Sequence, residues 1–456
     1  MQIPVIYKGR NIIGSITISY FIFILLVILF NRLSATRITS YAIVVFSAFP
    51  ALLYLGWNSK YKYGFNITGY ILLGLLVKLL IGFIFWQFYL FPDYFSDPAS
   101  NFKFDHREYL MTEQWMRQLA EYRLKFGYFS APNDMLLTKH FSIHFFMSNF
   151  YLSGKYNTLD ISVQNSVFSI FTAIIIAHIV KLEGGNSKQI KLALLLAIFQ
   201  PMSLISTMIW RDVVGQFFIA YGGYLIYKAS KSGGLNMVIL ITIASLSMYM
   251  QRLIYLFYPL LTILGFYLFQ KRGKYKLFFI PFVIFIVVYF NNTFLVSEQL
   301  AETYVKNINS TTLWIFLPFN IVRLLLGPLP WTNWFNFNDN TIFLISDYFQ
   351  SVMDISLIIL VFLAYRKIRK QMNLNSFFIL FVTLFFLFVL AGLGTGDIHL
   401  PYMATGAIFL IPIVTLIQSN QKFYSIFLMV FIFYIFLNIF GIALGLTGQG
   451  LGGSLR

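Results

Sequence analysis

The sequence has no cysteine among its 456 residues, which excludes disulfide bonds, thiolate metal sites and thiol nucleophiles. Charge is scarce as well, because charged residues make up 11% of the chain, against roughly 25% in a typical soluble domain. Hydrophobic residues make up 59%, and the mean hydropathy is +0.75. This composition excludes an ordinary soluble protein and predicts a chain that lies mostly within a lipid bilayer.

The motifs of soluble nucleotide-binding and hydrolytic enzymes are also missing. The chain has no GxxxxGK[ST] phosphate loop, no GxGxxG after a strand, no HExxH zinc motif and no GxSxG nucleophile elbow. Nucleotide-driven transport and soluble-type hydrolysis therefore have no support. The net charge of +17 does not indicate a nucleic-acid partner, because the basic residues lie in short loops and not on one continuous face.

Apolar runs of the length that crosses a bilayer, about 20 residues, recur from one end of the chain to the other. We therefore predict an all-α fold, a single polytopic membrane domain over residues 1–456 with about 12–13 transmembrane helices and one large early external loop. The candidate spans are 12–30, 41–57, 67–91, 161–181, 190–208, 212–228, 235–250, 253–269, 277–294, 347–364, 376–394, 401–417 and 424–446.

Basic residues gather on one side of this predicted topology. Cytoplasmic loops of membrane proteins carry an excess of Lys and Arg. When the N-terminus is placed in the cytoplasm, the cytoplasmic loops hold a single acid, Glu183. Two basic residues, Arg32 and Arg37, fall in an external loop and disagree with this rule. The basic residues of the cytoplasmic loops are Lys8, Arg10, Lys60, Lys62, Lys181, Lys188, Lys191, Lys228, Lys231, Lys271, Arg272, Lys274, Lys276, Arg366, Lys367, Arg369, Lys370 and Lys422.

Residues 92–160 form the one long segment that is polar enough to lie in water, and we predict an external loop with interfacial helices there. Half of the 16 acidic residues of the chain belong to this loop: Asp93, Asp97, Asp105, Glu108, Glu113, Glu121, Asp134 and Asp160. Because most of the chain is embedded in lipid, a large acidic and aromatic loop is the first place to expect chemistry.

Residues 105–126 of this loop are predicted to form an amphipathic helix. Apolar side chains recur there at spacings of three and four, namely Met111, Trp115, Leu119, Tyr122 and Phe126. The opposite face is polar and carries Arg107, Gln114, Arg117, Glu121 and Lys125. A helix of this kind is expected to lie on the bilayer surface with its aromatic side toward the lipid.

Two other apolar segments, 135–153 and 313–331, are predicted to be interfacial or re-entrant. If 135–153 crossed the membrane, every later basic loop would fall on the opposite side, against the charge rule. The segment 313–331 contains three prolines and Arg323, which disfavour a straight span.

The candidate catalytic residues are the acids Asp105, Asp97 and Glu108 of the large loop. A carboxylate near the membrane surface can act as a general base. Each acid also has a purely structural interpretation. Asp105 and Glu108 lie where solvated acids at a helix start are common, and Asp97 precedes a proline and can open a turn.

The candidate substrate- and phosphate-binding residues come from later in the chain: Arg211, Asp212, Arg252, Arg323, Asp397 and His399. Guanidinium groups bind phosphate bidentately. The structural alternatives are a salt bridge between Arg211 and Asp212 and membrane anchoring by Arg252. His140 and His144 are one helical turn apart but lack a clear third ligand, so no metal site is predicted and a divalent metal is optional.

Three short motifs follow one another in the first half of the chain. FDHREYL carries Asp105 and Tyr109 near a helix start, and KHFSIHFFMSNFYLSGKYNTLD leads from a short helix into a Gly-containing turn. FQPMSLISTMIWRDVVGQFF then carries Pro201 and the pair Arg211 and Asp212 before the next span. Over about residues 95–230 this order resembles the GT-C class of membrane glycosyltransferases, which take sugars from polyprenyl-phosphate carriers.

The resemblance implies a bacterial-type surface-polysaccharide glycosyltransferase in the inner (plasma) membrane, with its active site on the periplasmic or external face. Its partners would be a polyprenyl-phosphate-linked sugar or oligosaccharide and the membrane lipid. Asp105 would be the general base that activates an acceptor hydroxyl, with Asp97 as the substitute. Arg211, Arg252 and Arg323 would hold the lipid phosphate and stabilise its leaving charge.

Two alternatives stay open. The chain is similar in general character to bacterial O-antigen and capsule polymerases, which join undecaprenyl-diphosphate-linked repeat units, although the early acid-rich loop favours the transferase. A flippase or transporter for lipid-linked oligosaccharide should have charges along a path through the bundle, and only Lys78 and Asp354 lie well inside predicted spans. Where GT-C proteins often have an Arg before a Leu-x-Pro-like segment, GTGDIHLPYM has Asp397 and His399.

Overall fold

The computed structural model of the chain describes ten stretches of it. The described residues are 12–84, 106–132, 145–146, 148–153, 158–200, 212–250, 253–270, 341–363, 405–417 and 420–444.

Within these stretches the secondary structure is helical and contains no strand, which confirms the predicted all-α class. The α-helices are α1 (Ile12–Phe30), α2 (Arg37–Tyr63), α3 (Thr68–Ile84), α4 (His106–Phe126), α7 (Thr158–Leu182), α8 (Ser187–Ile198), α10 (Asp212–Ser230), α11 (Gly234–Tyr249), α12 (Tyr258–Gln270), α16 (Thr341–Leu363), α20 (Leu410–Ile417) and α21 (Asn420–Ala443). Short 3-10 helices are η1 (Asn31–Leu33), η3 (Tyr151–Ser153) and η4 (Leu253–Phe257).

Four of the described helices are long and apolar enough to cross a membrane: Ile12–Leu33, Ile38–Lys60, Asp160–Leu182 and Lys422–Phe440. Five shorter apolar helices accompany them in the described stretches: Thr68–Gly82, Gly234–Tyr249, Tyr255–Phe266, Phe349–Leu363 and Thr405–Leu416. These helices support a membrane protein, as the composition predicted. The count of about 12–13 spans and the single membrane domain over 1–456 stay predictions.

The chain divides into two compact units. Unit 1 is Met1–Phe199 with Ser206–Arg211, and it contains α1, α2, α3, α4, α7 and α8. Unit 2 is Gln200–Ile205 with Asp212–Arg456, and it contains α10, α11, α12, α16, α20 and α21.

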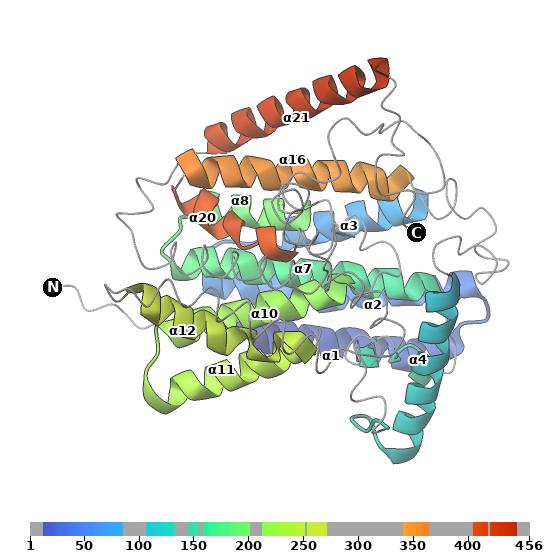
Figure 1. Cartoon of the computed structure of the whole chain (residues 1–456). Helices are drawn as coiled ribbons and strands as arrows, with labels where there is room; N and C mark the ends of the chain where they lie inside the picture. The colour runs from blue at the N-terminus through green and yellow to red at the C-terminus, as the bar shows by residue number, and fades with distance from the viewer. Residues whose placement is uncertain are drawn as a thin grey trace, which may run out of the picture. The chain divides into compact units, whose positions relative to one another are not determined.

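Helix α7 is the core of unit 1. Its membrane-span window is 94% buried, against 39% for the windows in α1 and in α2. It packs against α1, α2, α3 and α8, as the central position of its ribbon in unit 1 also indicates (Figure 1). A helix enclosed in this way meets protein and not lipid on nearly all sides, so polar side chains along it cost less than on a lipid-facing helix.

Different contacts join α2 and α7 at the two ends of unit 1. At one end the first turns of α2 and α7 are joined, because the Ser40 hydroxyl donates to the Asp160 carboxylate over 2.7 Å. At the other end Tyr63 of α2 lies against His178 of α7, with ring centroids 6.0 Å apart. The basic side chains Lys60, Lys181, Lys188 and Lys191 all belong to the turns at this second end. The basic turns of α2, α7 and α8 thus share one end of unit 1, whereas Arg32 and Arg37, the discordant pair of the predicted topology, lie at the other.

Two predicted spans differ from the structure at their ends. In the span predicted over 190–208, α8 ends at Ile198, because Gln200 precedes Pro201 and a residue before proline disfavours helical geometry; residues 201–208 lie outside the described residues. The 12 residues of α8 reach about 18 Å, short of the ~30 Å hydrocarbon core. The span predicted over 253–269 opens as η4 and becomes α-helical only at Tyr258, next to Pro259.

In unit 2, α10 and α11 form an antiparallel pair. Ser247, late in α11, donates its hydroxyl to the carbonyl of Phe218, early in α10, over 3.0 Å. Lys228 lies in the last turn of α10 and Lys231 directly after the helix. Both are therefore at the end opposite Asp212, the first residue of α10. Elsewhere in this unit α16 packs against α21 through a cluster of Val352, Val430 and Tyr434 with half-buried neighbours.

Candidate functional site

Most of the predicted site residues lie outside the described residues: Asp97, Asp105, Arg211, Arg252, Arg323, Asp397 and His399. Two of them belong to described helices. Glu108 is in the first turn of α4, in unit 1, and Asp212 is the first residue of α10, in unit 2. The described contacts join no two of the predicted site residues, so their assembly stays a prediction.

The helix predicted over 105–126 is confirmed as α4, which begins one residue after Asp105. Figure 1 shows α4 at a steep angle to α1, α2 and α7, running across them and not along them. Such an orientation suits a helix that lies along a membrane surface while its neighbours cross the membrane. Because α4 directly follows Asp105 in the chain, the position of α4 limits where this candidate base can lie.

The face of α4 that packs inward is not the predicted aromatic stripe. The side chains buried along it are Met116, Leu119, Ala120 and Arg123. Leu119 is common to both sets, but the inward face is rotated away from Tyr122 and Phe126. The reason is a tertiary contact: the segment 145–153 packs on this side, and its hydrogen-bond acceptors are directed at Arg123.

The guanidinium of Arg123 is the centre of this contact. It donates from Nε to the Tyr128 carbonyl over 2.7 Å and from Nη1 to the Phe145 carbonyl over 2.9 Å. It also donates from Nη1 to Ser148 Oγ over 2.5 Å and from Nη2 to Asn149 Oδ1 over 2.7 Å. All four acceptors are uncharged, and each bond is assisted by the guanidinium charge.

Two aromatic rings complete the enclosure of Arg123. Its guanidinium carbon lies 4.3 Å from the ring centroid of Tyr128 and 4.0 Å from that of Phe145. Burial lowers the pKa of Arg123, and the neighbouring Tyr128 offsets part of this effect. The guanidinium nevertheless stays protonated, as arginine does in proteins. Its partners make Arg123 a docking residue, and leave it little capacity to bind an anionic substrate.

A chain of hydrogen bonds continues from Arg123 into the bundle. Asn149, which accepts from Arg123, donates from Nδ2 to the hydroxyl of Tyr20 in α1 over 2.9 Å. The Tyr20 hydroxyl in turn donates to Gln164 Oε1 in α7 over 3.0 Å. Phe150 is fully buried and contacts Phe23 of α1 through rings 6.4 Å apart. The loop helix α4 is thus fixed to α1 and α7 through the segment 145–153.

The segment 135–153 was predicted as one interfacial or re-entrant helix. Its described residues form a short helical turn at 145–146, hydrogen-bonded turns at 148–150 and the 3-10 helix η3. They reach Tyr20, which is ten residues before the end of α1, or about 15 Å along the helix axis. This part of the segment therefore lies beside the middle of a membrane-span candidate, as a re-entrant segment does.

Asp160 differs from the prediction that it belongs to a water-exposed loop. It lies in the first turn of α7, fully buried, with Oδ2 hydrogen-bonded to Ser40 and Oδ1 without a hydrogen-bond partner. Asp354 in unit 2 has a similar environment, because Gln350 donates to its Oδ1 over 2.6 Å while Oδ2 has no hydrogen-bond partner. Both acids are polar groups in the interior of their units.

Lys78, like Arg123, is a buried basic residue of unit 1. It lies in α3 and donates from Nζ to Ser169 Oγ of α7 over 3.1 Å. This contact belongs to a polar row along buried α7 that the apolar pattern did not predict: Ser162, Gln164, Asn165, Ser166, Ser169 and Thr172. Among the residues that the structure describes, no group of three or more His, Asp or Glu side chains could hold a metal ion.

Comparison with known proteins found no match: no family model, no curated protein and no solved structure is similar to this chain. A functional assignment therefore depends on the residues of this chain alone. Sequence patterns did not predict the docking residues Arg123, Asn149 and Tyr20. An arginine on a loop helix and a tyrosine within an apolar run are both common and carry no specific signal. The serines and amides of α7 stand out in the sequence inside an otherwise apolar span, but their burial between helices depends on the tertiary structure.

Proposed function

We propose that this protein is a membrane glycosyltransferase of surface-polysaccharide synthesis that takes a sugar from a polyprenyl-phosphate carrier. The observation that supports this most is the docking of α4. Helix α4, which follows Asp105, is held against unit 1 by the hydrogen bonds of Arg123. The preceding helix α3 runs away from the end of unit 1 that carries Lys60, Lys181 and Lys188. The resemblance to GT-C enzymes over about residues 95–230 supports the same function.

The chemistry needs an acid at the depth of the lipid headgroups. A polyprenyl-phosphate sugar has its lipid in the hydrocarbon and its phosphate at the membrane surface, so the reacting carbon lies just outside the bilayer. A loop helix that runs along the surface brings a carboxylate to this depth, where Asp105 can take the proton of an acceptor hydroxyl. The arginines Arg211, Arg252 and Arg323 are proposed to neutralise the leaving phosphate.

The substitution Asp105→Asn tests this proposal. We expect the rate of sugar transfer to fall by about 100-fold or more, because the amide cannot accept the proton. The measurement is transfer from polyprenyl-phosphate sugars by the purified protein in liposomes. The matched control is Glu121→Gln, which removes an exposed acid from α4 and should leave transfer unchanged. Equal loss in both variants, or none in Asp105→Asn, contradicts the assignment of the base.

The surface glycan of a deletion strain separates the transferase from its alternatives. Loss of the transferase should remove one sugar or branch from otherwise long chains. A repeat-unit polymerase should instead leave single-unit glycans on the surface, and loss of a flippase should leave complete lipid-linked units on the cytoplasmic side. Either of the last two profiles overturns the proposal.

A further inference from the structure

Helix α4 has three faces, of which two have an evident role. The inward face is buried against the segment 145–153, and a second face is polar and exposed, with Arg117, Gln118, Glu121 and Lys125. The third face carries Tyr122 and Phe126, whose ring centroids are 4.5 Å apart. Phe126 is 58% exposed although it belongs to the apolar stripe of the sequence, and Tyr122 is half-buried, so the described residues leave this face largely uncovered.

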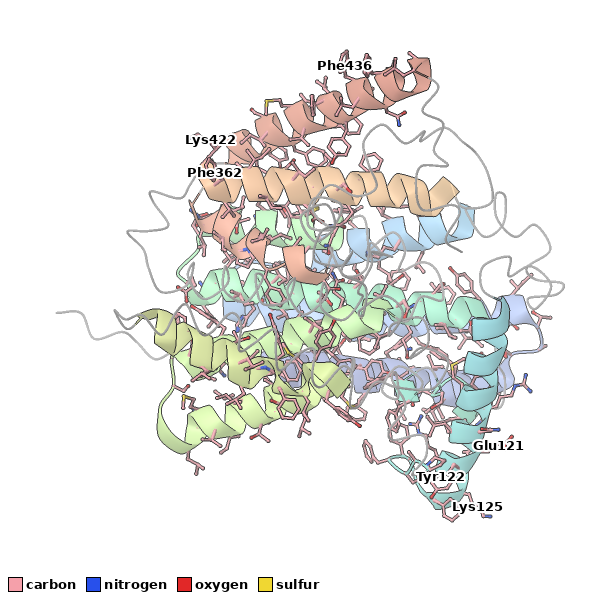
Figure 2. All side chains as sticks on the ribbon, in the orientation of Figure 1. Glu121, Tyr122, Lys125, Phe362, Lys422 and Phe436 are labelled. Atoms are coloured by element: carbon pink, nitrogen blue, oxygen red, sulfur yellow. The ribbon has the colours of Figure 1, made fainter. Side chains whose placement is uncertain are left out.

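The exposed apolar surface continues beyond the end of α4. Gly127 turns the chain with a φ of 113°, a value that favours glycine, and Phe129 follows with 77% of its surface exposed. We call the side chains of Tyr122, Phe126 and Phe129 the α4 tip. Figure 2 shows Tyr122 at the end of α4 that points away from α1, α2 and α7.

The position of the α4 tip relative to the membrane follows from Arg123, which directly follows Tyr122 in the chain. Asn149 is the one side chain between Arg123 and Tyr20, in the middle of α1. Because α1 is long and apolar enough to cross a membrane, this end of α4 lies close to the hydrocarbon and not far out in water. The steep angle of α4 to α1 and α7 directs it along the membrane plane (Figure 1).

We propose that the α4 tip inserts into the headgroup–acyl boundary of one leaflet. Aromatic side chains favour this depth, and helices that lie there combine such a face with a basic polar face. Lys125 fits the arrangement, because its ammonium lies 5.2 Å from the ring centroid of Phe126 and can reach lipid phosphates while the ring enters the acyl region. The inference concerns the docking of a loop helix on lipid and does not depend on the proposed function.

The absence of native cysteine makes the test direct, since single cysteines carry a spin label with no background. Labels are placed at positions 126 and 129 in the α4 tip and, as matched controls, at positions 118 and 121 on the polar face. The protein is reconstituted in vesicles of phosphatidylcholine and phosphatidylglycerol. Collision with oxygen, which concentrates in lipid, is compared with collision with a water-soluble nickel complex.

We expect the oxygen-to-nickel ratio at positions 126 and 129 to be several-fold higher than at positions 118 and 121. A ratio at the tip equal to that of the controls overturns the proposal, because the tip would then be in water. Low collision with both reagents also overturns it and indicates cover by protein. In that case, dipolar broadening between labels identifies a second copy of the chain as the occupant. The spectral line shapes of the four positions verify that α4 is folded in each labelled protein.

Discussion

At the scale of single residues, Arg123 shows how a charge can be buried with no acidic partner among the residues that the structure describes. Its four acceptors are two backbone carbonyls, a hydroxyl and an amide oxygen, and two aromatic rings lie around it. Hydrogen bonds to a charged group contribute about 1.5–3 kcal/mol each. The fork geometry of the guanidinium lets one side chain bind acceptors on both sides of the turn, which a lysine cannot do.

We predict that Arg123→Lys detaches α4 although it keeps the charge. Losing about 2 kcal/mol or more from this contact should raise the population of the detached helix by roughly 30-fold or more. Trypsin cleavage after Arg117 and Lys125, both exposed, measures this population when opening is fast. The control Gln118→Ala, on the exposed face of the same helix, should cleave like the wild type. An unchanged cleavage rate in Arg123→Lys would show that the charge alone suffices.

At the scale of helices, close backbone approach determines how unit 1 packs. A Cβ atom added to Gly56 of α2 would come within 2.9 Å of the Cα atom of Thr68, the first residue of α3. Backbone atoms cannot move aside as the end of a flexible side chain can. Small residues of this kind are common where helices of membrane proteins cross, because they let backbones approach.

We expect Gly56→Ala to lower the stability of the protein by about 1–3 kcal/mol, because α2 and α3 must move apart. Gly14→Ala in α1 is the matched control, since a Cβ atom there meets nothing within 4 Å. This control should be neutral or slightly stabilising, as alanine is the better helix former. The thermal unfolding midpoint of each variant in detergent measures the difference. Equal midpoints for the two variants would mean that the α2–α3 crossing is loose.

At the scale of the whole molecule, the predicted topology requires the basic turns of the helices to gather on one side of the bilayer. The packing within unit 1 places the basic turns at one end of α2 and α7 and the joined first turns, with Ser40 and Asp160, at the other. In unit 2, Lys228 and Lys231 lie at the end of α10 opposite Asp212. Each unit by itself thus groups several lysines at one end, while Arg32 and Arg37 lie at the other end of unit 1, and the positive-inside topology of the whole chain stays a prediction.

Labelling from one side of the membrane tests this arrangement. Single cysteines at Glu121 and Lys188, both exposed, should react with a membrane-impermeant maleimide from opposite sides of sealed vesicles. A cysteine at Lys274, which lies outside the described residues, extends the test to the predicted topology of later loops and should react from the side of Lys188. Reaction of positions 121 and 188 from the same side would contradict the topology and the proposed function together.

The existence and class of the helices could be predicted from the sequence because the bilayer imposes them locally. A segment in hydrocarbon must satisfy its backbone within itself, so an apolar run becomes a helix whatever its neighbours are. For this reason the predicted segment 12–30 has the bounds of α1, and 161–181 differs from α7 by only a few residues. The helix 105–126 was equally evident, because its spacing of apolar residues is a local property.

Tertiary structure alone decided which face of α4 is buried and which is free, because that depends on the segment 145–153 packing from elsewhere in the chain. It also decided that Asp160 is enclosed, since Ser40 comes from a helix more than a hundred residues earlier. The predicted site could not be assembled from sequence for the same reason. Composition and periodicity determine the solvent in which each segment lies, whereas contacts between distant segments determine what each polar side chain meets there.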